Sequence, residues 1–158
     1  MTTLNYQHLE SPIGTLRLLS DGQALVRIEF ENHLQEDGDQ RCDAVREKTA
    51  AQLQQYFAGE RRHFELPLAP GGTDFQQGVW NQLRAIPFGE LRTYRDVAVS
   101  VGNLKAVRAV GVANGRNPIP IVVPCHRVVG SNGKLTGFAG GLNVKRKLLA
   151  LEGLELSE

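Results

Sequence analysis

The chain has 158 residues, of which 41% are hydrophobic and 22% charged, a composition typical of a soluble globular protein. No apolar run approaches the roughly 18 residues that a membrane helix needs, and no basic stretch followed by an apolar block opens the chain, so we expect neither a membrane segment nor a signal peptide. Two cysteines, Cys42 and Cys125, are too few for a disulfide framework, and we therefore expect a reducing, cytoplasmic setting.

The charge is distributed unevenly, although the formal net charge is only +1. Residues 1–73 contain 7 Lys or Arg and 11 Asp or Glu, whereas residues 74–158 contain 11 Lys or Arg and 6 Asp or Glu. The first half is therefore acidic and the second half basic. This asymmetry points toward a polyanionic partner for the second half.

Alternating apolar and polar residues predict three short strands, at 4–10, 14–20 and 24–30. Turn residues in "SPIG" and "SDGQ" separate them, which predicts an antiparallel meander.

The rest of the first half is predicted to hold one helix between irregular segments. Residues 31–42 are polar and are expected to form a surface loop, whereas apolar residues recur with a helical period over 43–60, where Gly59 is placed to end the helix. Residues 61–73 are expected to be extended. Their "APGG" is the best candidate linker, which divides the chain into domains at 1–72 and 73–158.

The second half begins with a predicted helix over 74–86, which Pro87 ends. One face of this helix collects its large apolar residues, which are Phe75, Val79, Trp80, Leu83 and Ile86. Thr93 is expected to cap a short helix over 94–101. A glycine turn and a second short helix over 105–113 complete a helix-turn-helix pattern.

Two further elements surround the most unusual residues of the chain. Residues 118–123, "PIPIVV", are expected to be extended. Residues 142–154 are expected to form a last helix, with basic residues early and Leu148, Leu149 and Leu151 facing inward.

Cys125 is the first candidate for chemistry, because it stands in the run "PCHR" between an apolar stretch and a glycine-rich loop. A buried core thiol is the commonest role of an unpaired cysteine. His126 and Arg127 are poor core residues, however, and with Lys145 they are candidate sources of the base or positive field that a thiolate nucleophile needs. Adjacent residues of an extended segment point to opposite faces, so a Cys–His contact requires a turn or a bridging water. No CxxC or HxxxH accompanies Cys125, which argues against a metal site.

The helix-turn-helix pattern makes DNA binding a candidate function of the same half. Lys105 and Arg108 give its second helix positive charge, although two such charges are often only a solvated face. Glycines, which allow close backbone approach to a ligand, are frequent between residues 130 and 141. The co-location of these features with Cys125 favours a nucleic-acid site over separate, ordinary elements.

The segments "KAVRAVGVANGRNPIPIVV" (105–123) and "PCHRVVGSNGKLTGFAGG" (124–141) resemble the methylated-DNA–protein-cysteine methyltransferases, also called O6-alkylguanine-DNA alkyltransferases. "IPFGELRTY" (86–94) and "KRKLLALEG" (145–153) fit the same family. The resemblance implies an α/β N-terminal domain with a ribonuclease H-like antiparallel sheet, and a mostly helical C-terminal domain with a helix-turn-helix. It also implies direct reversal of DNA alkylation, in which the alkyl group of O6-alkylguanine passes irreversibly to a cysteine.

The resemblance assigns the transfer to a small set of residues. Cys125, as a thiolate, would attack the alkyl carbon of a flipped-out nucleotide, and each molecule would react once. His126 would take the thiol proton through a bridging water, and Glu152 would hold His126 in the required tautomer. Asn117 would brace the turn before the site, and Tyr94 would lie against the flipped nucleotide. No cofactor and no metal are implied.

The same resemblance implies a DNA surface and a base pocket. Helix 105–113 would enter the minor groove, where Arg108 would fill the space left by the flipped base. The other residues expected to contact DNA are Tyr94, Lys105, Ala109, Ala113 and Arg116. The base pocket is expected to comprise Pro120, Val128, Phe138 and Ala139, with the Cys125 and Val128 carbonyls accepting the guanine amine and the Ala139 N–H donating to O6.

The expected partner is double-stranded DNA containing O6-alkylguanine, with O4-alkylthymine as a further substrate and cooperative self-association along DNA. Three positions depart from the family pattern, namely Leu104, Phe138 and Lys147, where many relatives have Pro, Tyr and an aromatic residue. Three other functions remain open at this point. They are a damage sensor without transfer, a DNA-binding regulator, and a cysteine hydrolase, which would need an oxyanion hole and would turn over.

Overall fold

The computed structural model describes residues 4–34, 38–40, 43–135 and 137–155, so Cys42 lies outside the described residues. Two compact units divide the chain, Met1–Gly71 and Gly72–Glu158. Within the described ranges, no helix combines the length and the apolar character needed to cross a membrane.

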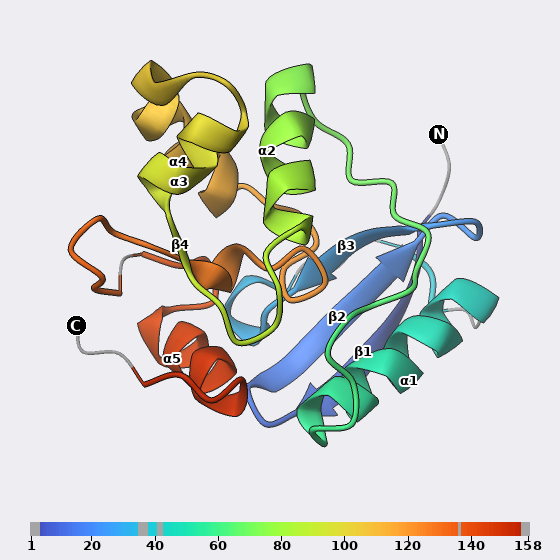
Figure 1. Ribbon diagram of the computed structural model, residues 1–158. Helices are drawn as coiled ribbons and strands as arrows, with labels where there is room; N and C mark the ends of the chain where they lie inside the picture. The colour runs from blue at the N-terminus through green and yellow to red at the C-terminus, as the bar shows by residue number, and fades with distance from the viewer. Residues whose placement is uncertain (1–3, 35–37, 41–42, 136, 156–158) are drawn as a thin grey trace. The chain divides into compact units, whose positions relative to one another are not determined.

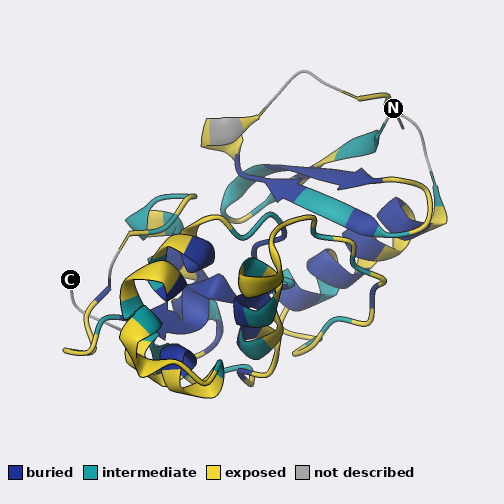
Figure 2. Ribbon diagram, turned by 90° about the horizontal axis from the view of Figure 1, so that it is seen from above, coloured by how far each residue is buried: buried dark blue, intermediate teal, exposed yellow. Residues whose placement is uncertain are grey.

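The N-terminal unit is built on an antiparallel sheet of three strands in the order β1-β2-β3 (Figure 1). The strands are β1 (Asn5–Ser11), β2 (Gly14–Ser20) and β3 (Leu25–Glu29), which confirms the predicted meander. The central strand is buried from Leu16 to Ser20, on both of its faces (Figure 2). Helix α1 (Ala44–Phe57) packs against the sheet and is followed by Gly59 at φ +78°. The expected surface loop contains a short 3-10 turn, η1 (Glu31–His33).

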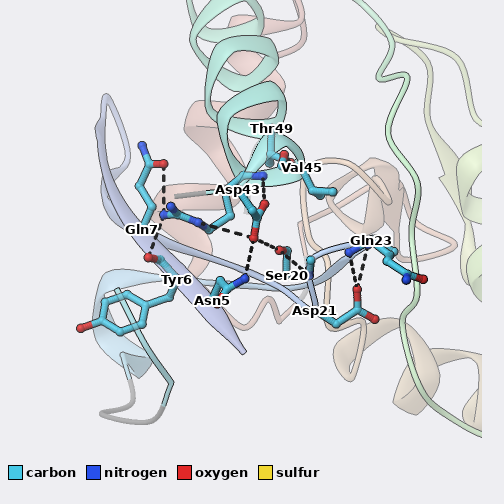
Figure 3. Close-up of polar contacts among 12 residues, drawn as sticks. Asn5, Tyr6, Gln7, Ser20, Asp21, Gln23, Asp43, Val45 and Thr49 are labelled. Carbon is cyan, nitrogen blue, oxygen red and sulfur yellow. Dashed lines mark hydrogen bonds and ion pairs between the residues drawn. The ribbon is translucent and has the colours of Figure 1, made fainter. Parts of the chain in front are cut away.

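Asp43 joins the start of α1 to the sheet (Figure 3). Its Oδ1 accepts the backbone N–H of Arg46 at 2.8 Å, and its Oδ2 accepts the Ser20 hydroxyl at 2.5 Å and the Asn5 amide at 2.9 Å. Burial raises the pKa of Asp43, but these hydrogen bonds and the Arg46 charge outweigh it and hold the pKa below its ordinary value. The carboxylate therefore fixes α1 over the ends of β1 and β2.

The C-terminal unit opens with α2 (Asp74–Arg84), which a capping box starts. The Thr73 hydroxyl accepts the Gln76 N–H at 3.1 Å, and the Gln76 side-chain oxygen accepts the Thr73 N–H at 3.0 Å. Most of the predicted apolar face is buried, namely Val79, Trp80, Leu83 and Ile86. Phe75, in the first turn of α2, is 40% exposed, so the predicted apolar face is not buried at its N-terminal end.

A helix-turn-helix follows, drawn in yellow in Figure 1. Thr93 caps α3 (Tyr94–Ser100) through a second capping box, with Asp96. The second helix differs from the prediction at both ends: a 3-10 turn, η2 (Leu104–Ala106), precedes α4 (Val107–Gly115). The Asn103 side chain accepts the Lys105 N–H at 3.1 Å and so tightens this first turn.

The three helices α2, α3 and α4 pack on one another. The indole N–H of Trp80 on α2 donates to the carbonyl of Ala113 on α4 at 2.9 Å. This bond ties the last turn of α4 to α2. The unit is completed by a two-stranded parallel ladder of β4 (Arg92–Thr93) and β5 (Val128–Val129), and by α5 (Leu142–Leu151). Leu148 and Leu149 are buried as predicted, whereas Leu151 is half-buried.

The expected extended conformation of residues 118–123 is wrong. The chain makes a tight turn in which Pro120 and Val123 form a bridge and Ile121 has φ +75°. The Asn117 side chain accepts the Ile119 N–H at 3.0 Å and donates to the Val123 carbonyl at 2.8 Å. These two bonds draw the ends of the segment together, which local sequence preferences do not reveal.

Candidate active site

Cys125 lies at the start of a single 3-10 turn, η3 (Cys125–Arg127), which leads directly into β5. The turn is closed by the Arg127 N–H, which donates to the Pro124 carbonyl at 3.0 Å. The chain is therefore not extended here, and the opposite orientation expected for neighbours on a strand does not apply to Cys125 and His126. Cys125 is 4% exposed and is a free thiol.

A buried carboxylate, Glu152, organises the residues after the cysteine. It directly follows α5, and its Oε2 lies 2.7 Å from His126 Nε2. Arg127 donates to the same carboxylate from Nε at 2.8 Å and from Nη2 at 3.1 Å, and the Gly89 N–H donates at 3.1 Å. Arg127 also donates from Nη1 to the Ile86 carbonyl at 2.7 Å, which links the site to the end of α2.

This arrangement determines the tautomer of His126. Because the Glu152 carboxylate is an acceptor, Nε2 carries the proton and Nδ1 carries the lone pair. Nδ1 is buried and has no hydrogen-bond partner in the parts of the chain that the structure describes. Burial lowers the pKa of His126, although Glu152 acts in the opposite direction. The imidazole is therefore neutral at pH 7, with one basic nitrogen available.

The thiol of Cys125 is protonated in this closed arrangement. Burial raises its pKa to about 11, and a hydrogen bond from Asn117 and the charge of Lys145 offset part of the rise. At neutral pH the thiolate must therefore form by transfer of the proton to a base rather than by spontaneous ionisation.

Three further residues surround the site. Two of them, Arg127 and Lys145, were predicted as candidate sources of a base or positive field for the thiolate, whereas Asn114 was not predicted. Arg127 holds Glu152, and the Asn114 side-chain amide lies 3.4 Å from the Cys125 carbonyl. Lys145 on α5 is buried and donates from Nζ to the Val128 carbonyl at 2.7 Å. Asn114 and Lys145 lie within the sequence segments that resemble the family, which is the one indication of them in the sequence. Their burial follows only from the packing of the folded chain.

The residues expected to contact DNA fall into two groups. Arg108, Ala109, Arg116 and Lys105 are exposed, on α4, next to it and on η2. The assignment of Ala113 as a DNA contact is not supported by its side chain, which is 2% exposed, because α4 turns Val110, Ala113 and Asn114 inward. Val112, which was not among the predicted residues, is 55% exposed and lies one turn from both Arg108 and Arg116.

The remaining predicted residues lie around the turn and the glycine-rich loop. Tyr94, the first residue of α3, is half-buried beside Gly111 of α4, where an added methyl group would lie 4.0 Å from the ring. Pro120 and Val128 are buried, Phe138 is half-buried and Ala139 is exposed. Among the described residues, no group of three or more His, Cys, Asp or Glu is placed to hold a metal ion.

Family comparisons account for both units. Residues 4–70 match the family model described as the ribonuclease-like domain of 6-O-methylguanine DNA methyltransferase, and residues 74–154 match its DNA-binding domain. The chain belongs to the methylated-DNA–protein-cysteine methyltransferase family. A family member from Methanosarcina acetivorans is 49% identical over 152 residues, which cover 94% of this chain and 97% of that protein. One from Haemophilus influenzae is 46% identical, over 96% of this chain and 88% of that protein.

Solved structures of the family show the same fold. The Mycobacterium tuberculosis O6-methylguanine methyltransferase has a TM-score of 0.86 and 45% identity, over 94% of this chain and 92% of that one. The enzyme of that organism in complex with DNA has a TM-score of 0.87 and 45% identity, over 94% and 93% of the two chains. The predicted fold, an antiparallel-sheet domain followed by a helical domain, is confirmed.

Proposed function

We propose that this methyltransferase repairs duplex DNA by moving the alkyl group of O6-alkylguanine to Cys125, once per molecule. The observation that carries the assignment is the chain of groups behind the thiol. Neutral His126 has a buried, unpartnered Nδ1, and its other nitrogen contacts the Glu152 carboxylate at 2.7 Å. A nucleophile, a base and a group that orients the base are the components of activated-cysteine chemistry.

The substrate must leave the duplex to reach this site. O6 of guanine belongs to a base that is stacked and paired in the duplex, and the Cys125 thiol is buried, so the alkylated nucleotide has to be flipped out to reach the sulfur. The exposed Arg108 on α4 and Arg116 directly after it supply positive charge for the DNA backbone, and Arg108 fills the space of the missing base. Tyr94, beside Gly111, lies against the flipped nucleotide. We assign DNA binding and transfer to residues 73–158.

The proton and the electron pair of the transfer are accounted for by groups of the protein, the guanine and one water molecule. The thiol proton passes through the water to Nδ1 of His126, and Glu152 stabilises the imidazolium that forms. Sulfur attacks the alkyl carbon, the bond from carbon to O6 breaks, and its electron pair goes to the guanine. The Ala139 N–H donates to O6, and the guanine takes back a proton from His126. The product thioether is stable, so the molecule reacts once.

A binding-only damage sensor is the second candidate, because the pKa of the buried thiol is raised to about 11. The intact mass of the protein after incubation with excess O6-methylguanine duplex separates the two. Addition of one methyl group, located on Cys125 by fragmentation and absent in Cys125→Ser, supports transfer. The matched control is Cys42→Ser, which should gain the methyl group like the wild type. Tight binding with unchanged mass would leave only the sensor.

The proposal also covers the setting of the reaction. The reactive free thiol suits a reducing, cytoplasmic compartment. If the protein self-associates cooperatively along DNA, the fraction of a long duplex that is bound should rise more steeply with protein concentration than the bound fraction of a duplex that holds one copy. Equal steepness on both duplexes would remove this part of the proposal.

A further inference from the structure

Among the described residues of the C-terminal unit, two buried side-chain atoms have no hydrogen-bond partner, and the reaction described above uses one of them. They are Nδ1 of His126, which takes the thiol proton, and Oδ1 of Asn114. Asn114 is only 4% exposed. Buried polar side-chain atoms are normally hydrogen-bonded, because an acceptor that is removed from water and given no donor costs free energy. The Asn114 oxygen is therefore in need of a donor.

Asn114 lies where the second helix of the helix-turn-helix reaches the nucleophile. It is in the last turn of α4, and its Nδ2 donates to the Cys125 carbonyl at the long distance of 3.4 Å. This contact fixes the orientation of the amide, since a carbonyl accepts from the NH₂ group and not from the oxygen. Oδ1, bonded to the same carbon atom as Nδ2, is thereby held beside the residue that carries the thiol.

The side-chain donors around this turn are bonded to other acceptors. The Asn117 amide donates to the Val123 carbonyl at 2.8 Å. Arg127 donates to Glu152 from Nε at 2.8 Å and from Nη2 at 3.1 Å. Since these donors are engaged, the substrate is the natural source of a donor for Asn114 Oδ1.

O6-alkylguanine carries such a donor on the edge that reacts. Its O6 and its exocyclic amine flank N1 on one edge of the base, so a base that presents the alkyl carbon to Cys125 also brings the amine close to the thiol. Alkylation at O6 removes the proton from N1, which leaves the amine as the one N–H donor on that edge. The amine has two N–H groups, so a backbone carbonyl and the Asn114 oxygen can each accept one of them.

We propose that Asn114 is a specificity-determining residue for the damaged base, whose side-chain oxygen accepts the exocyclic amine of the flipped O6-alkylguanine. The inference rests on the proposed function, because it places the reacting edge of the base against Cys125. It also ranks the substrates. O4-alkylthymine presents its O2 carbonyl where guanine has the amine, so two acceptors would face each other and Asn114 disfavours this base.

The test compares a base with and without the amine. Single-turnover methyl-transfer rates are measured on matched duplexes that contain O6-methylguanine or O6-methylhypoxanthine, which lacks the exocyclic amine. Leucine is close to asparagine in size but accepts no hydrogen bond, so Asn114→Leu should lower the ratio of the two rates about tenfold, with the loss falling on the guanine substrate. Asn143→Leu changes an exposed asparagine on α5 and should keep the wild-type ratio.

The ratio separates recognition of the amine from other roles of Asn114. A merely structural asparagine, or one that holds the water between Cys125 and His126, would slow transfer from both bases equally. An unchanged ratio in Asn114→Leu therefore overturns the inference, while the proposed function stands. With O4-methylthymine as a third substrate, the rate relative to O6-methylguanine should rise in Asn114→Leu, and an unchanged or lower relative rate would contradict the inference.

A measurement on the unmutated asparagine covers the case in which Asn114→Leu does not fold. In Cys125→Ser, which cannot transfer the methyl group, the ¹³Cγ resonance of Asn114 is compared between complexes with the two duplexes. A hydrogen bond to Oδ1 should move this resonance to higher frequency with O6-methylguanine and not with O6-methylhypoxanthine. The same resonance position in both complexes would refute the contact. If the shift is seen but the wild type transfers no methyl group, the contact stands and the proposed function fails.

Discussion

Replacing Glu152 by leucine tests whether one carboxylate both stabilises the C-terminal unit and orients the base. Glu152 is 6% exposed and accepts hydrogen bonds from Arg127, His126 and Gly89. The substitution leaves the Arg127 guanidinium buried without its anion. Removing one partner of such a pair costs about 3–5 kcal/mol, because the other charge stays in a poorly solvated place. We expect Glu152→Leu to lower the free energy of unfolding of this unit by that amount.

Urea unfolding followed by tryptophan fluorescence is the assay. The chain has a single tryptophan, and Trp80 is buried on α2 of the same unit. The double variant Arg127→Met/Glu152→Leu removes both charges, so it should recover most of the lost stability. Methyl transfer should nevertheless stay about 10²–10⁴-fold slow in the double variant, because His126 still lacks the carboxylate that fixes its tautomer.

Two results would refute this reasoning. If the double variant is as unstable as Glu152→Leu, the cost does not come from an unpaired Arg127. If the double variant transfers methyl groups at the wild-type rate, Glu152 has no part in orienting His126, whatever its effect on stability.

Four further outcomes are expected. Cys125→Ser should lose transfer while keeping its DNA affinity in a gel-shift titration, and residual methylation of this variant would contradict the nucleophile. Arg108→Ala should slow repair in duplex DNA more than transfer from the free O6-methylguanine base, and equal losses would exclude a part in flipping. Asp43→Ala should destabilise the N-terminal unit by about 1–2 kcal/mol in a hydrogen-exchange measurement, since a helix cap is lost; unchanged protection of α1 would refute this. The pKa of the Cys125 thiol is about 11 in the folded protein and 9.0 for the ordinary group, so the thiol contributes stability below pH 9 that is lost as the pH rises from 9 to 11. This loss should appear in the denaturant midpoints of the wild type and be absent from those of Cys125→Ala.

Local sequence signals were sufficient for most of the secondary structure. The meander, α1 and the Thr93 cap follow from alternation, helical period and capping residues, which act over a few neighbouring residues. The turn at 118–123 was missed because the side chain of Asn117 makes it, by bonding to two backbone groups of that segment. Apolar and proline-rich letters alone favour an extended chain there.

The site could be predicted in outline but not in its electrostatics. The run Pro124 to Arg127 and the family resemblance brought together the adjacent Cys125 and His126 with Glu152, which lies 26 residues after His126. The burial of Lys145 was not predictable, because a lysine on an amphipathic helix is solvated by default. The inward orientation of Ala113 was missed for a similar reason: a short helix rich in small residues has no clear apolar face, so packing against Trp80 decides its rotation.

The left-handed conformation of Ile121 has a consequence for how the site tolerates change. A β-branched residue at φ +75° costs about 1–3 kcal/mol, yet Ile121 is also buried in the core, so the fold gains apolar burial where it loses backbone energy. Glycine would relieve the backbone and leave a void, whereas another large residue would keep the strain. The residue at position 121 must therefore both accept a positive φ and fill its place in the core. Few side chains satisfy both requirements, so few substitutions are tolerated in the turn that leads to Cys125.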